Sequence, residues 1–174
     1  MTSGVGGTGA VPFHAQLAAR YVGLREVAGK AHDPLIVAMI RQAGGDPLAG
    51  DETPWCGAFV NWVAWNCGLE RPKLPLRARS WLTVGEPVDV REAMPGDVLV
   101  FSRRVGDAEP PGAEVLDAPG HVCFLARWLT TLTGGLPRLL VLGGNQGAGV
   151  VSVVERSIGP LLGVRRLRPA TPEL

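Results

Sequence analysis

Cys56 is the residue of this sequence whose position best suits covalent chemistry. It stands directly after Thr53-Pro54-Trp55, at the start of an apolar stretch that is expected to be helical. The free N–H groups and the positive end of the dipole at a helix start favour the thiolate, which is the nucleophilic form of cysteine. We therefore expect Cys56 to act as a nucleophile.

A cysteine nucleophile needs a base, and the chain has three histidines, His14, His32 and His121. The first two lie in the N-terminal region that is expected to be helical. His121 instead opens a predicted strand after Pro119-Gly120, where a side chain can project from the end of a sheet. A helix start that faces a strand start brings an imidazole within hydrogen-bond reach of a thiol. We therefore expect His121 to be the base.

The imidazole in turn needs a partner that fixes its orientation and tautomer. Asn145 and Gln146 are the candidates, because they follow a predicted strand that should pair with the strand of His121. The amide oxygen of either residue can accept the imidazole N–H. We favour Asn145, with Gln146 as the alternative.

Three helices are predicted in the N-terminal half, because apolar residues recur there at helical spacing. Their ranges are 13–28, 34–43 and 55–67, and the second has Asp33 as its N-cap and Pro34 at its first position. The third is apolar around most of its circumference, which indicates a buried central helix. A shorter helix is predicted over 77–84 and ends at Gly85.

Strands follow the helices in the order of the chain. Their predicted ranges are 97–101, 121–128, 138–142, 150–154 and 163–167, and the proline-rich stretch 102–120 is expected to be a long surface loop. This order predicts an α+β fold with N-terminal helices packed on a central antiparallel sheet. Residues 1–11 are rich in Gly, Ser and Thr and are expected to form a flexible leader, so residues 12–174 form one domain.

Composition excludes several classes of protein. The 174 residues are 46% hydrophobic and 19% charged, which is typical of one globular domain, and the net charge of +1 gives no basic stripe for nucleic acid. Three cysteines exclude a complete disulfide framework, and their spacing is not that of a zinc site, so no metal or cofactor is expected. No stretch approaches the roughly 20 apolar residues of a membrane span, and no signal peptide is visible, so we expect synthesis in the cytoplasm.

Aromatic and basic residues near these motifs suggest how a substrate is held. Of the tryptophans, Trp62 and Trp65 are expected in the core, whereas Trp55 and Trp81 are expected to line a cleft and bind substrate. The arginines of this part of the chain are expected on the solvated surface; they are Arg77, Arg79 and Arg103.

Taken together, the motifs resemble those of the NlpC-type and CHAP-type papain-like peptidoglycan hydrolases. The resemblance rests on Trp55-Cys56-Gly57-Ala58-Phe59-Val60, then Gly96-Asp97-Val98-Leu99-Val100-Phe101, then Gly120-His121-Val122. It is strongest with the bacterial and phage subfamily that has a Trp-Cys-x-x-Phe-Val-x-Trp motif and a Leu-Gly-Gly-Asn-Gln strand, which is residues 142–146 here. It covers nearly the whole chain after the leader.

This resemblance implies a papain-like fold and a cysteine peptidase or amidase that cleaves amide bonds in the stem peptides or cross-bridges of peptidoglycan. It implies Cys56 as nucleophile, His121 as base and Asn145 as the third catalytic residue. The reaction would pass through an acyl-enzyme, with the backbone N–H of Cys56 as one donor to the oxyanion.

Because no signal peptide is visible, such an enzyme would reach the periplasm or cell wall by non-classical delivery, as an antibacterial effector or a phage-type lysin. An effector would have an immunity protein as partner. Two alternatives stay open. One is an intracellular cysteine deamidase or acyl transferase of the same fold, and the other is a catalytically inactive module that binds the cell wall.

Overall fold

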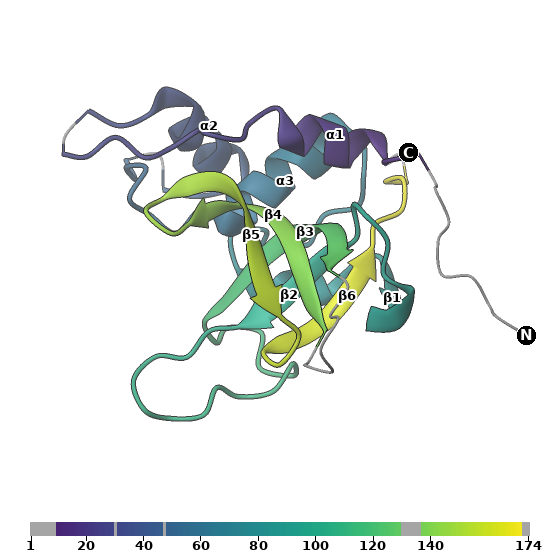
Figure 1. The fold of residues 1–174 in the computed structure, drawn as a ribbon. Coiled ribbons are helices and arrows are strands. Elements are labelled where there is room, and N and C mark those ends of the chain that lie inside the picture. The colour runs from purple at the N-terminus through teal and green to yellow at the C-terminus, as the bar shows by residue number, and fades with distance from the viewer. Residues whose placement is uncertain (1–9, 30, 47, 130–136, 172–174) are drawn as a thin grey trace, which may run out of the picture.

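The computed structural model describes residues 10–29, 31–46, 48–129 and 137–171. Within these residues, helices in the N-terminal half are followed by an antiparallel sheet, as Figure 1 shows, and the predicted α+β class is confirmed. Residues 1–9 of the predicted leader lie outside the described residues. The elements are α1 (Phe13–Ala19), α2 (Pro34–Gln42), α3 (Cys56–Asn66), the 3-10 helices η1 (Ala78–Thr83) and η2 (Val90–Glu92), and the strands β1 (Glu86–Val88), β2 (Val98–Ser102), β3 (Gly120–Leu129), β4 (Arg138–Gln146), β5 (Val150–Ser157) and β6 (Leu161–Arg166).

The strands form one sheet in the order β1-β6-β2-β3-β4-β5, and each neighbouring pair is antiparallel. The three α-helices gather on one side of this sheet (Figure 1). The prediction that N-terminal helices pack on an antiparallel sheet is therefore confirmed. The long connection from β2 to β3 leads directly into Gly120 and His121.

Each face of the sheet is apolar, so the sheet separates two cores. The face toward the helices carries Val98, Val100, Val122, Phe124, Leu142 and Val151, which pack with α2 and α3. The opposite face carries Leu99, Phe101, Cys123, Leu125, Leu139 and Val141, which pack with residues around η2. Because side chains alternate along a strand, His121 belongs by position to the second face, together with Cys123.

Helix α3 is the central buried helix that the sequence predicts, and it is shorter than the predicted range by one residue at each end. Eight of its eleven residues are buried, from Cys56 through Val60 and then Asn61, Val63 and Ala64. Gly57 is required at its first turn, since a Cβ there would lie 2.3 Å from the carbonyl oxygen of Pro75. Close approach of the 75–76 backbone thus fixes where the helix begins.

The largest differences from the predicted boundaries are at the ends of α1 and β4. Helix α1 ends at Ala19 rather than at residue 28, because Gly23 takes a positive φ of 96° and donates its N–H to the Val151 carbonyl at 2.9 Å. The chain thereby leaves the helix to run beside β5. Strand β4 continues to Gln146 rather than ending at Leu142. The short strand β1, which the sequence does not predict, pairs with β6.

Candidate active site

Cys56 lies at the first position of α3, and only 7% of the residue is exposed. Its thiol faces the backbone N–H groups of Gly57 and Val122, and both favour the thiolate. Gly57 belongs to the open first turn of the same helix, where N–H groups have no helical partner. Val122 follows His121 in β3. The helix start therefore brings the thiol to the strand that carries the predicted base.

The thiol reaches β3 where that strand parts from β4. The ladder between the two strands begins at the pair Phe124–Leu142, so residues 121–123 are not paired to β4. Two glycines in β4 allow side chains into this opening. A Cβ on Gly144 would lie 2.5 Å from a ring carbon of Trp55, and a Cβ on Gly143 would lie 2.8 Å from Cβ of Cys123. The Gly-Gly pair thus leaves room for the Trp55 indole on one face and for the Cys123 side chain on the other.

His121 is 8% exposed and pairs with Phe101 across the β2–β3 ladder. Its Nε2 is buried and has no hydrogen-bond partner among the described residues. The imidazole lies on the Cys123 side of the sheet, whereas Cys56 arrives from the helix side. The two predicted residues therefore approach β3 from its opposite faces.

The two candidates for orienting the imidazole have different positions. The Gln146 side chain lies beside His121, where it raises the pKa of the imidazole against the stronger opposing effects. Gln146 is itself fixed by hydrogen bonds from its Nε2 to the carbonyl oxygens of Ser152, at 2.6 Å, and Gly143, at 3.2 Å. The structure thus places Gln146, the alternative, at the imidazole.

Asn145, the favoured candidate from the sequence, has other partners. It has a positive φ of 54°. In the amide orientation that satisfies its neighbours, Asn145 accepts the Trp55 backbone N–H at 3.0 Å and donates to the Glu26 carboxylate at 3.3 Å. Among the described residues no hydrogen bond joins Asn145 to His121. Its contact is with the peptide that precedes the nucleophile.

The two tryptophans predicted to bind substrate are fully buried, so neither lines an open cleft. The Trp55 indole N–H donates to the Glu26 carboxylate at 2.8 Å, and its ring packs on Phe59 edge to face. The Trp81 indole N–H donates to the Pro75 carbonyl at 3.0 Å. Both rings pack and form hydrogen bonds around the start of α3. The prediction that they line an open cleft is therefore wrong.

Burial is the largest influence on the pKa values of Cys56 and His121. It raises the pKa of the Cys56 thiol, while the Val122 and Gly57 N–H groups and the charge of Arg103 act in the opposite direction without cancelling it. Burial also lowers the pKa of His121 to about 4, and Arg156 adds to this effect. At neutral pH the structure therefore holds a thiol and a neutral imidazole rather than an ion pair.

Arg79 is a residue near the site whose role the sequence does not reveal. It was expected on the surface, but it is fully buried. Its guanidinium donates to four backbone carbonyls of the loop that leads to His121, those of Pro111, Gly112, Val115 and Pro119, at 2.7–3.3 Å. Its aliphatic stem lies against Gly120. Arg79 thereby fixes the backbone directly before the predicted base, and an arginine in a polar stretch gives no signal of this role.

In the part of the chain that the structure describes, no group of three or more His, Cys, Asp or Glu side chains is arranged to hold a metal ion. None of the described helices has both the length and the apolar character needed to cross a membrane. Comparison with protein-family models, curated proteins and solved structures finds no match to this chain.

Proposed function

We propose that this protein is a cysteine hydrolase of papain-like type in which Cys56 is the nucleophile and His121 the base. The observation that carries the proposal is the contact of the Cys56 thiol, at a helix start, with the N–H of the residue that follows His121. The same strand, β3, carries the buried imidazole of His121 on its opposite face. Such a pair supports acyl transfer by a thiolate with a neighbouring base.

In the proposed reaction, the ring nitrogen of His121 that faces the thiol takes its proton, and the Cys56 sulfur attacks the carbonyl carbon of an amide. The carbon–nitrogen bond breaks, and the imidazolium returns the proton to the leaving amine. Water then loses a proton to His121 and hydrolyses the thioester, which regenerates the thiol. The helix-start N–H of Cys56 is the proposed donor to the oxyanion.

We propose Gln146 rather than Asn145 as the residue that orients the imidazole. Gln146 is buried, lies beside His121 and is held from two sides by backbone carbonyls. An amide fixed in this way limits the rotation of the ring and selects which nitrogen carries the proton. Asn145 instead supports the Trp55 peptide, so we assign it a role in placing the nucleophile's helix.

The proposed substrate is an amide bond in the stem peptides or cross-bridges of peptidoglycan. This choice rests on the resemblance of the cysteine, Gly-His and Gly-Gly-Asn-Gln motifs to the peptidoglycan hydrolases. We further propose that the protein acts in the periplasm or cell wall as an antibacterial effector or phage-type lysin. In the first case an immunity protein would be its partner.

Zymography on purified sacculi tests this function. We expect the unmodified protein to clear the gel and Cys56→Ala to lose clearing. Cys123→Ala is the matched control, because Cys123 is also a buried thiol and lies on β3, two residues beyond the predicted base. Clearing by Cys56→Ala would refute the assignment of the nucleophile. Absence of clearing by the unmodified protein, with a Cys56 thiol that still reacts with iodoacetamide, would refute the substrate.

The pH dependence of the rate tests the orienting residue. We expect Gln146→Leu to lower kcat by about a hundredfold and to move the acid limb of the pH–rate profile, because the imidazole loses its neighbour. Asn145→Gly keeps the positive φ and is the control. It is expected to lower stability while the pH profile stays in place. A shifted profile in Asn145→Gly and an unshifted one in Gln146→Leu would reverse the two roles.

One observation favours a second candidate, a module that binds the cell wall without hydrolysing it. Both Cys56 and His121 are more than nine-tenths buried, and burial moves both pKa values away from those of an active pair. A pull-down on sacculi separates the two functions. Binding that is equal in the unmodified protein and in Cys56→Ala, without release of soluble fragments, would support the binding module.

A further inference from the structure

The residue before the candidate nucleophile is the N-cap of α3, and its side chain does not cap the helix. Trp55 makes no side-chain hydrogen bond to the first turn, and that turn carries no acidic residue. Ser, Thr, Asp or Asn usually fill this position, because their side-chain oxygen accepts an N–H group of the first turn. The place of Cys56 therefore depends on what holds Trp55 from outside the helix.

Glu26 is connected to Trp55 by a closed set of hydrogen bonds. Its Oε1 accepts the indole N–H of Trp55 at 2.8 Å. In the amide orientation that satisfies its neighbours, Asn145 donates to the same oxygen at 3.3 Å and accepts the backbone N–H of Trp55 at 3.0 Å. One carboxylate oxygen thus fixes the indole directly and the peptide through Asn145. Both hydrogen bonds to this oxygen are of the stronger, charge-assisted kind.

Glu26 is itself held in one place. Its backbone N–H donates to the Gly149 carbonyl oxygen at 2.9 Å. Gly149 has a φ of 67°, and a Cβ there would collide with the carboxyl group of Glu26. The N–H of Val27, the next residue, donates to the fully buried carboxylate of Asp51 at 2.8 Å. Among the described residues no basic side chain forms an ion pair with Glu26, so its carboxylate is left to the hydrogen bonds described above.

We propose that Glu26 is a positioning residue that holds Cys56 in place through Trp55 and Asn145. Without this carboxylate, the indole loses its acceptor and the first turn of α3 moves more freely. The Cys56 thiol, in a residue that is 7% exposed, then reaches solvent more often and is aligned for attack less often. Loss of Glu26 therefore speeds the alkylation of Cys56 and slows its catalysis. The second effect rests on the proposed function, whereas the first requires no substrate.

Alkylation by iodoacetamide, measured separately at each cysteine by mass spectrometry, tests the effect on the thiol. Cys67 follows the last residue of α3 and Cys123 lies in the core, so their rates report fraying of the helix and unfolding of the protein. We expect Glu26→Ala to raise the Cys56 rate about tenfold relative to both, as the loss of a charge-assisted hydrogen bond predicts. Glu26→Gln is expected to stay within about twofold of the unmodified protein, because its amide oxygen still accepts both N–H groups.

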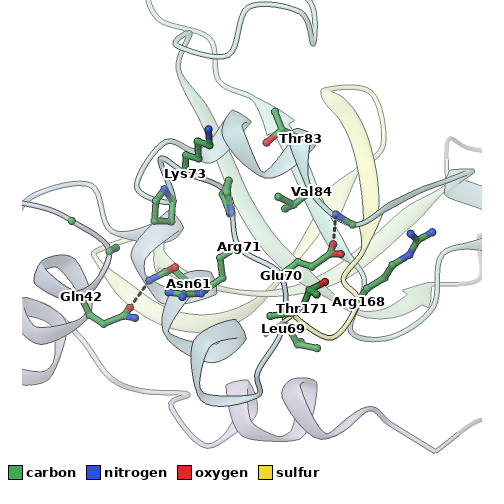
Figure 2. Close-up of a pocket in the computed structure, with 16 residues that line it drawn as sticks. Gln42, Asn61, Leu69, Glu70, Arg71, Lys73, Thr83, Val84, Arg168 and Thr171 are labelled. Atoms are coloured by element: carbon green, nitrogen blue, oxygen red, sulfur yellow. Dashed lines mark hydrogen bonds between the residues drawn. The ribbon is translucent and has the colours of Figure 1, made fainter. Parts of the chain in front are cut away.

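Gln42→Ala is the matched control, because it removes a side-chain hydrogen bond from another point of the same helix. Gln42, at the end of α2, accepts the side-chain N–H of Asn61 on α3, as Figure 2 shows. Neither Glu26 nor Cys56 lines the pocket drawn there. We expect this variant to unfold at a lower urea concentration, while the alkylation of Cys56 relative to the other two cysteines stays unchanged. Trp55→Phe removes the indole N–H but keeps an aromatic ring, and it should raise that ratio as Glu26→Ala does, so the test remains if Glu26→Ala does not fold.

Hydrolysis of soluble peptidoglycan fragments separates this proposal from the proposed function. We expect Glu26→Ala to lower kcat about tenfold and to leave KM within about twofold of the unmodified value. If the unmodified protein hydrolyses nothing, the proposed function fails, and the alkylation ratio alone decides the role of Glu26. An unchanged ratio in Glu26→Ala and Trp55→Phe, or a rise as large in Glu26→Gln or Gln42→Ala, would overturn the proposal. A higher KM with an unchanged kcat would overturn it as well.

Discussion

The protonation of His121 gives a direct test of whether the candidate site is closed in solution. The perturbation is His121→Gln, which removes the titrating group but keeps a polar side chain of comparable length. Burial lowers the pKa of His121 from 6.5 to about 4 in the folded protein. In the unfolded chain the imidazole is solvated and keeps its ordinary pKa.

The sign of the effect follows from which state binds the proton. Between pH 6.5 and about 4 the unfolded chain binds a proton at His121 and the folded protein does not, so stability falls as the pH falls through this range. From about pH 7.5 to about pH 4.5, these two pKa values give a loss of about 2.5 kcal/mol from this residue alone. Other titrating groups contribute equally in the variant and cancel in the comparison.

The assay is urea denaturation at both pH values, followed by tryptophan fluorescence. We expect the unmodified protein to lose about 2.5 kcal/mol more than His121→Gln on acidification. Gln16→Ala, an exposed change that removes no titrating group, is the control, and it should lose as much as the unmodified protein. If the unmodified protein and His121→Gln lose the same stability, the imidazole is solvated in the folded state and the closed site is refuted.

Two further predictions concern the elements that form the site. Gly144→Ala places a Cβ 2.5 Å from the buried Trp55 ring, so we expect a loss of about 1–3 kcal/mol in urea denaturation, and no loss would show that β4 shifts freely there. Arg79→Met removes the donors to four loop carbonyls and should cost about 2–4 kcal/mol, whereas its exposed neighbour variant Arg77→Met should cost less than about 0.5 kcal/mol. Equal effects of the two arginine variants would refute the proposed anchoring of the loop.

Local sequence predicts the elements that bear the thiol and the imidazole. The apolar circumference of α3 predicts a buried helix, and Cys56 begins it. The prediction of a core position for Trp65 is wrong, because this residue lies near the end of the helix and is 49% exposed. The Asp33 cap is also local, and its carboxylate accepts the Leu35 and Ile36 N–H groups at 2.9 and 3.1 Å. Strand β3 follows from a Gly-His opening before an apolar run. Signals of this kind act within one turn or one strand, and they need no knowledge of the rest of the fold.

The end of β4 and the orientation of its last side chains depend on residues that are distant in the sequence, so local patterns did not predict them. The strand predicted from local pattern ends at Leu142, yet β4 continues to Gln146, because β5 pairs with it at Gly143 and Gln146. Once the strand continues, Gln146 points to His121 while the positive φ of Asn145 turns it toward Trp55 and Glu26. Choosing between the two amides therefore requires the register of a strand that lies several residues later.

The closed site also constrains how the protein would become reactive. Burial is the largest cause of both pKa shifts, that of the Cys56 thiol upward and that of His121 downward. Any motion that admits water must therefore lower the first pKa and raise the second together, which moves the proton from sulfur toward nitrogen. The rate of Cys56 alkylation should then follow the opening of the site rather than the pH alone.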